Sequence, residues 1–149
     1  MKRIAAALLS CAALAACGGQ SSAVSQAERT KELMNESIDP LAWVVWRNAG
    51  YVITEEGEQN LAPTTDEGWE EVRQAALDLA EASQLLLERD VARESDTWGV
   101  FANGLAAQAG VAAEAAAAHD DDRLFDAGGA IYNVCSGCHQ QFSPEIASR

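Results

Sequence analysis

Residues 132–142 read Tyr-Asn-Val-Cys-Ser-Gly-Cys-His-Gln-Gln-Phe, and this stretch near the end of the chain decides how the rest is interpreted. Within it, Cys135, Cys138 and His139 form a CxxCH pattern, which is the attachment signature of a covalently bound c-type haem. The two thiols can form thioethers to the porphyrin vinyl groups, and the following histidine can bind the iron as an axial ligand. The stretch therefore predicts one covalent haem c.

Two other kinds of site use closely spaced cysteines, namely zinc sites and redox dithiols. A structural zinc site needs four ligands, whereas the chain has only one other histidine, His119, and no second closely spaced cysteine pair beside this motif. A thioredoxin-like dithiol needs a strand-to-helix turn inside an α/β pattern, and the sequence shows no such pattern. Both alternatives are therefore weaker than the haem interpretation.

The N-terminus has the features of an export signal. Residues 1–3 are Met-Lys-Arg, and residues 4–16 are apolar but too few to span a bilayer. The following Leu14-Ala15-Ala16-Cys17 resembles the lipobox of bacterial lipoproteins, in which the cysteine is lipidated and begins the mature chain. Cys11 fits the same pattern loosely but leaves a very short apolar region, and a cleaved signal without lipid is a further alternative.

These assignments account for all four cysteines. Cys11 leaves with the signal, Cys17 takes the lipid, and Cys135 and Cys138 take the haem, so no disulfide has to be placed in an oxidising compartment. We expect a signal peptide over 1–16, a short lipidated linker over 17–24 and a cytochrome domain over 25–149. The predicted location is the periplasm, with the protein anchored by its lipid to a bacterial membrane.

The chain is strongly acidic, with a formal net charge of −13. Loss of Lys2 and Arg3 with the signal would take this charge to −15, since every acidic residue lies beyond the signal. Such a surface disfavours nucleic acid as a partner. It suits docking to a basic redox partner protein, although general solvation explains it equally well.

Four stretches rich in alanine and leucine have helical periodicity. The first runs from about Ser25 to Gly50, with Pro40 expected to kink or restart it, and residues 51–63 are expected to form a long loop. The second opens at the capping-box pattern of residues 64–67 and should end near Asp90. The expected inward residues are Met34, Ile38, Leu41 and Val45 in the first helix, and Trp69, Val72, Ala76, Leu79, Ser83 and Leu86 in the second.

The third and fourth helices are joined by a short connection. Thr97 is expected to cap the third, and the acidic run 120–122 is expected to cap the fourth and not to bind a metal ion. The third should turn Trp98, Phe101, Leu105, Gln108 or Ala109, Ala112 and Ala116 inward, and the fourth carries Leu124, Phe125, Ile131, Cys135, Cys138 and Phe142. The predicted fold is therefore all-α, an antiparallel up-down four-helix bundle.

With these features, nearly the whole mature chain resembles the class II c-type cytochromes, the cytochrome c prime family. The resemblance is carried by YNVCSGCHQQF at 132–142 and, more weakly, by ELMNESIDPLAWVVW at 32–46. It implies a four-helix bundle with haem c at the C-terminal helix, covalent attachment at Cys135 and Cys138, and His139 as axial ligand. It also implies that the first helix lies on the distal side of the iron. Family members are often dimers, so a homodimer stays open.

The distal side of the iron has two candidates, Met34 and Leu33. Met34 is the only methionine left after processing, and it lies on the inward stripe, where it could bind the iron or simply pack. Family members often carry an arginine four residues before the distal residue, and here Arg29 precedes Leu33 at that distance. An apolar Leu33 would leave a five-coordinate iron. Arg29 and Lys31 could bind the haem propionates or be solvated.

The leading functional prediction is electron transport by a metal-binding protein, whose haem iron cycles between Fe(II) and Fe(III) with His139 as proximal ligand. The alternative is a five-coordinate haem protein that binds or buffers a diatomic gas such as nitric oxide. Enzyme activity is not expected, because His119 should lie roughly 25–30 Å from His139 along a continuous helix and could not act as an acid or base at the iron.

Overall fold

The first helical path runs through three segments without a break. The computed structural model describes residues 18–89 and 94–147, and in it α1 (Gly18–Leu33) continues through the π-helical turn η1 (Met34–Ile38) into α2 (Asp39–Arg47). The N–H of Asp39 donates to the carbonyl of Met34, five residues back. Pro40, in the first turn of α2, has no N–H to continue the usual ladder. The irregularity predicted at Pro40 therefore takes the form of a π turn immediately before it.

α1 begins earlier than Ser25, the start expected from periodicity. Its first residue is Gly18, so the stretch 18–24 that was assigned to a linker is helical. Cys11 and Cys17, together with the predicted signal peptide, lie outside the described residues. No helix within the described ranges is both long enough and apolar enough to cross a membrane.

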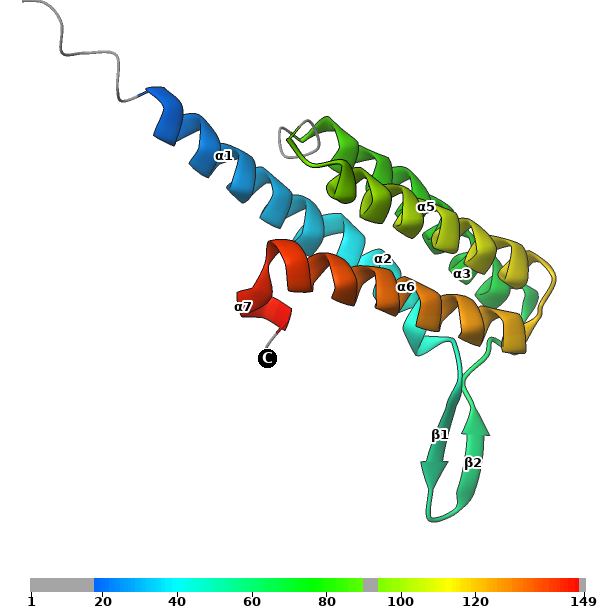
Figure 1. Ribbon diagram of the computed structural model, residues 1–149. Coiled ribbons are helices and arrows are strands. Elements are labelled where there is room, and N and C mark those ends of the chain that lie inside the picture. The colour runs from blue at the N-terminus through cyan, green and yellow to red at the C-terminus, as the bar shows by residue number, and fades with distance from the viewer. Residues whose placement is uncertain (1–17, 90–93, 148–149) are drawn as a thin grey trace, which may run out of the picture.

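The prediction of a long loop over 51–63 was wrong in part, because an antiparallel hairpin occupies most of it. Strand β1 (Tyr51–Thr54) pairs with β2 (Gly57–Asn60), with Tyr51 opposite Asn60 and Thr54 opposite Gly57. The β-branched residues and tyrosine of β1 favour an extended chain. Gly57 lies directly after the two-residue turn, and its φ of 128° is a conformation that other residues rarely adopt. The hairpin projects from one end of the bundle (Figure 1).

The second long helix, α3 (Asp66–Gln84), follows its prediction closely. Thr65 is the N-cap, and its Oγ1 accepts a hydrogen bond from the N–H of Gly68 at 3.1 Å. The helix continues into the 3₁₀ turn η2 (Leu85–Glu88), close to the predicted end near Asp90, which itself is outside the described residues. The whole predicted inward stripe is buried: Trp69, Val72, Ala76, Leu79, Ser83 and Leu86.

The remaining helices are α5 (Asp96–Ala117), α6 (Asp121–Phe142) and the short α7 (Pro144–Ala147). Thr97 does not cap α5 as predicted, because the helix has already begun at Asp96 and Ser95 takes the N-cap position. Asp120 does cap α6, since its Oδ1 accepts from the N–H of Arg123 at 2.9 Å. The three residues between α5 and α6 form the short connection that was expected.

The four long helical segments are α1 to α2, α3, α5 and α6, and successive segments run in opposite directions (Figure 1). Their inward faces share one core, whose largest fully buried side chains are Leu79, Leu124, Ile131, Val45, Val72 and Ser83. Alanines such as Ala109 and Ala112 are also fully buried, which allows α5 to approach its neighbours closely. The described chain is therefore a mostly helical bundle with a small two-stranded sheet.

One hydrogen bond anchors α2 to α6 within this packing. The indole Nε1 of Trp46 donates to the carbonyl of Gly128 at 3.0 Å. Trp46 also packs edge-on against Tyr132, one turn further along α6. On the same helix Phe125 is 54% exposed, in contrast to the neighbouring Leu124, which is fully buried. The outward face of α6 is therefore partly aromatic.

Candidate functional site

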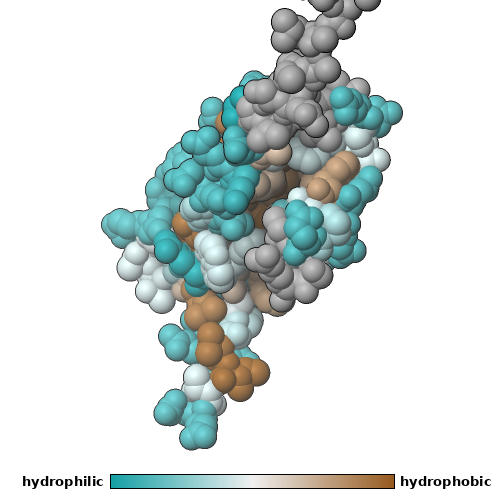
Figure 2. All heavy atoms as spheres, turned by 90° about the vertical axis from the view of Figure 1, so that its left-hand side faces the viewer, coloured by the Kyte–Doolittle hydropathy of each residue, from teal (hydrophilic) through white to brown (hydrophobic). Residues whose placement is uncertain are grey.

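An apolar cleft lies at the end of the bundle where α6 finishes. It is formed by η1, η2, α5 and α6, and its cavity volume is about 20 Å³, so the side chains that line it have to move apart before a cofactor-sized group can enter. In the space-filling view, apolar atoms lie at the bottom of a hollow at this end (Figure 2). The cleft is lined by Met34, Ile38, Leu86, Trp98, Phe101, Ala102, Leu105, Val134, Cys135, Cys138 and His139.

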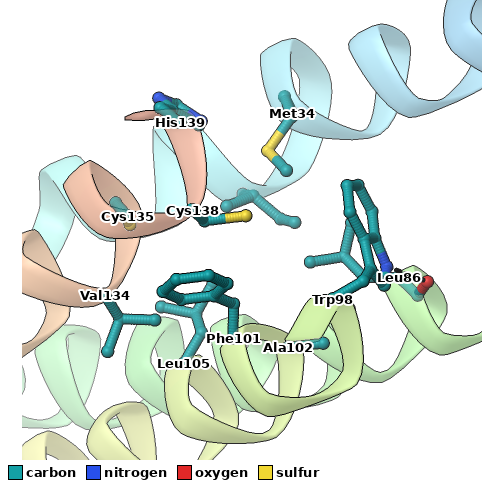
Figure 3. Close-up of a pocket in the computed structure, with 11 residues that line it drawn as sticks. Met34, Leu86, Trp98, Phe101, Ala102, Leu105, Val134, Cys135, Cys138 and His139 are labelled. Carbon is teal, nitrogen blue, oxygen red and sulfur yellow. Dashed lines mark hydrogen bonds between the residues drawn. The ribbon is translucent and has the colours of Figure 1, made fainter. Parts of the chain in front are cut away.

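The CxxCH residues lie in the last two turns of α6. Because Cys135, Cys138 and His139 are three and four residues apart on one helix, they share the face that borders the cleft. Figure 3 shows the sulfur of Cys138 turned into the space beside α5, with His139 at the rim. All three are partly buried. The local arrangement of the motif is thus a direct result of helical spacing.

Both thiols are held in their neutral form. Burial, with smaller contributions from the carboxylate of Asp39 and from Cys138, raises the pKa of Cys135 to about 11. Burial also raises the pKa of Cys138 above its ordinary value. The two cysteines form no disulfide. Each therefore presents a protonated thiol to an apolar cavity.

A wall of aromatic rings from α5 and α6 closes one side of the cleft. Trp98 packs edge-on against Phe142 with ring centroids 5.1 Å apart, and Phe101 contacts the same ring at 6.3 Å. The indole N–H of Trp98 donates to the carbonyl of Leu86 at 2.8 Å, which satisfies its one polar group. This wall can accept a flat apolar group without leaving a buried donor unpaired.

Gly137, in the middle of the motif, allows this close approach of α6 and α5. A Cβ at this position would lie 3.0 Å from Cε1 of Phe101. A side chain there would require the phenylalanine ring to shift by a few tenths of an ångström. The second x position of the motif therefore favours glycine in this chain.

Met34 and Leu33 are adjacent in the chain but line different hollows. Met34 lines the apolar cleft, and Figure 3 shows its sulfur directed toward the space that Cys138 and Trp98 also face. Leu33 is only 8% exposed and lines a different hollow, together with Arg29. The structure thus brings Met34, and not Leu33, to the cysteines and His139.

His119 does not belong to this site. It lies just beyond the end of α5 in the left-handed region, at φ 53°, and its ring stacks on Trp69 with centroids 5.1 Å apart. The α5 to α6 turn is at the opposite end of α6 from the motif (Figure 1). The two histidines therefore lie at opposite ends of α6, and His119 is remote from the motif as predicted.

Among the described residues, no three His, Cys, Asp or Glu side chains are grouped closely enough to hold a metal ion directly. The cleft instead combines apolar walls, two neutral thiols and one imidazole. This set of groups suits a large apolar cofactor that is attached through sulfur and completed by nitrogen and thioether ligands. The two thiols, the imidazole and the thioether of Met34 are therefore the chemical types of group that hold a c-type haem.

Sequence reasoning missed two parts of this region. The π turn of η1 was not expected, although Pro40 signalled an irregular helix. Arg89, which follows the η2 turn, was not considered at all. It lies three residues after Leu86, the last inward residue of the second helix. That spacing places it on the same face as the buried leucine, which was the signal that could have identified it. Comparison with protein-family models, curated proteins and solved structures gives no match to this chain.

Proposed function

We propose that this chain is a haem c electron carrier, with Cys135 and Cys138 holding the haem covalently and His139 as the proximal ligand. The observation that carries the proposal is the meeting of Met34 with the complete CxxCH motif at one apolar cleft. Bound haem would supply an iron centre that accepts and releases one electron. The resemblance to class II c-type cytochromes supports the same assignment.

The chain's own groups would set the properties of such a centre. The rings of Trp98 and Phe101 keep water from one face of the cleft, which lowers the local dielectric. The thioether of Met34 is a soft donor that favours the reduced state when paired with histidine. A second imidazole for acid or base work is lacking, because His119 packs on Trp69. We therefore assign electron transfer and not enzymatic turnover.

Exchange of both cysteines for serine tests the proposal most directly. In Cys135→Ser/Cys138→Ser, we expect complete loss of the haem that stays with the wild-type chain through denaturing electrophoresis, because no sulfur remains to form a thioether. Ser136→Ala, on the same helical turn, is the matched control and should keep its haem. Haem that remains covalent in the double variant, or wild-type protein that never acquires haem, would contradict the assignment.

The ligand on the distal side separates electron transfer from gas binding. If Met34 binds the iron, the wild type should be six-coordinate and low-spin, and Met34→Ala should become high-spin by absorption and resonance Raman spectroscopy. Leu33→Ala is the control and should leave the spin state unchanged. A five-coordinate wild type would instead favour the gas-binding alternative, with the apolar side chains around Met34 lining the ligand pocket.

We further propose that the protein acts in the periplasm, anchored to a bacterial membrane by lipid on Cys17. The net charge of −13 suits a redox partner with a basic surface, and a homodimer is compatible with the exposed aromatic side chains on α2 and α6. Labelled palmitate should enter the wild type and not Cys17→Ser. An unlabelled wild type would rule out the anchor while leaving the haem assignment intact.

A further inference from the structure

A second hollow, which we call the arginine hollow, lies beside the apolar cleft. Neighbouring residues of the chain line the two. In η1, Met34 and Ile38 line the cleft, while the preceding residues Leu33 and Ser37 line the hollow. Near η2, Leu86 lines the cleft and Arg89 lines the hollow. The arginine hollow has a volume of about 340 Å³. Its residues are Arg29, Glu32, Leu33, Glu36, Ser37 and Arg89.

Arg89 has an unusual environment for a charged residue. Its Nε atom is buried and has no hydrogen-bond partner among the residues that the structure describes. The backbone at Arg89 is extended and ends the η2 turn, with its N–H donating to the carbonyl of Leu86. A buried guanidinium N–H without an acceptor is costly, so such groups are normally paired.

Three other arginines of the described chain form ion pairs with glutamates. Arg47 contacts Glu71 at 2.6 Å, Arg73 contacts Glu70 at 2.5 Å and Arg123 contacts Glu114 at 2.5 Å. Within the described part of the chain, neither Arg89 nor Arg29 has such an ion pair. Glu32 and Glu36 border the same hollow, but both are exposed to solvent. No side chain in the described ranges therefore supplies an acceptor for Arg89 Nε.

We propose that Arg89, assisted by Arg29, binds the carboxylates of the haem whose ring occupies the apolar cleft; this inference rests on the proposed function. A haem has an apolar ring and two propionate carboxylates at one edge, so it requires an apolar cavity next to groups that bind carboxylates. The cleft is the apolar cavity, and the hollow beside it holds Arg89 and Arg29 together with the exposed carboxylates of Glu32 and Glu36, so the buried Nε of Arg89 is the group left for a propionate. The planar guanidinium fork of arginine matches a carboxylate better than any other side chain does.

The test measures selectivity for free carboxylates. In the Cys135→Ser/Cys138→Ser background, haemin binding is compared with binding of haemin dimethyl ester, which has the same ring but no carboxylate. We expect haemin to bind at least about tenfold more tightly than the ester, as a charge-assisted pair would give. Adding Arg89→Met should bring the two affinities within about threefold, whereas the control Arg123→Met should leave the preference unchanged.

Arg89→Lys keeps the charge but lacks Nε, so its preference for haemin over the ester should be intermediate. This variant also keeps the test valid if circular dichroism shows that Arg89→Met folds poorly. The covalently loaded protein gives a second readout. Its resonance Raman propionate-bending band should shift in Arg89→Met and not in Arg123→Met. An unshifted band, or an ester that binds as tightly as haemin to the background protein, would overturn the role of Arg89 without affecting haem binding.

Two other outcomes identify different failures. Wild-type protein without haem would remove the proposed function itself, and the inference with it. Tight binding of succinate to the haem-free protein, abolished by Arg89→Met and accompanied by equal haemin and ester affinities, would show that the hollow takes a free dicarboxylate. That result would overturn the assignment of the hollow to haem propionates.

Discussion

The two ends of the bundle differ in how their polar groups are paired. At the α5 to α6 turn, Asp120 caps α6, Arg123 pairs with Glu114, and Asn60 of the hairpin donates to Asp121 at 2.7 Å. At the other end, burial keeps the thiol of Cys135 neutral and Arg89 Nε has no acceptor. A turn that only has to close the fold can pair all its groups within the chain. A binding site keeps some groups available for another molecule, and this contrast marks the cleft end as the candidate site.

Shortening one side chain at each end should give the largest difference in stability. Leu124 is fully buried near the α5 to α6 turn, so we expect Leu124→Ala to lower the free energy of unfolding by about 2–5 kcal/mol. Met34 is partly buried and borders an existing cleft, so Met34→Ala in haem-free protein should cost about 1 kcal/mol or less. Urea unfolding measures both values. Equal losses would show that the cleft end is packed as tightly as the core.

Two glycines on α6 allow a matched test of crowding. At Gly137 a Cβ would meet the ring of Phe101 at 3.0 Å, so Gly137→Leu should destabilise the protein by about 1–2 kcal/mol and lower its haem content. A Cβ at Gly129 meets nothing within 4 Å, so Gly129→Leu should be stabilising by about 0.5–1 kcal/mol through helix propensity alone. Thermal unfolding of the two variants decides this. A stabilising Gly137→Leu would mean that the aromatic wall moves freely.

The smallest expected effect is a loss of stability at alkaline pH. The pKa of the Cys135 thiol rises from its ordinary 9.0 to about 11 in the folded, haem-free protein. Because the folded state favours the neutral thiol, the contribution of Cys135 to the free energy of unfolding is fully present below pH 9 and is lost as the pH rises toward 11. At pH 10 the loss should be of the order of 1 kcal/mol.

Comparison with Cys135→Ala isolates that thiol from the other alkaline groups. Reduced, haem-free protein is unfolded with urea at pH 7.5 and at pH 10, and the difference between the two pH values should be smaller in the variant. The same pH dependence in both proteins would show that Cys135 is more accessible to solvent than its burial indicates. Loading with haem should abolish the effect, because a thioether sulfur does not titrate.

Local rules predicted most of the helical structure. Thr65 caps α3 and the inward stripe of that helix is buried, because capping and helical periodicity depend on residues only a few positions apart. The hairpin was missed because β2 reads Gly-Glu-Gln-Asn, which has little strand propensity of its own. That strand exists through its pairing with β1. The start of α5 was misplaced by two residues, because Ser95 and Thr97 are both residues that cap helices.

The sequence by itself determined the placing of the CxxCH residues on one helix face and most of the inward helix faces, with Phe125 as an exception, since these follow from spacings of three and four residues along one chain. Only the tertiary structure showed that Met34, and not Leu33, lines the cleft with the CxxCH residues, because adjacent residues on a helix point about 100° apart and the neighbouring helices fix which of them faces the cleft. The position of Arg89 beside Arg29 depends in the same way on two helices meeting. Such contacts join residues about sixty positions apart in the chain, and no local pattern specifies them.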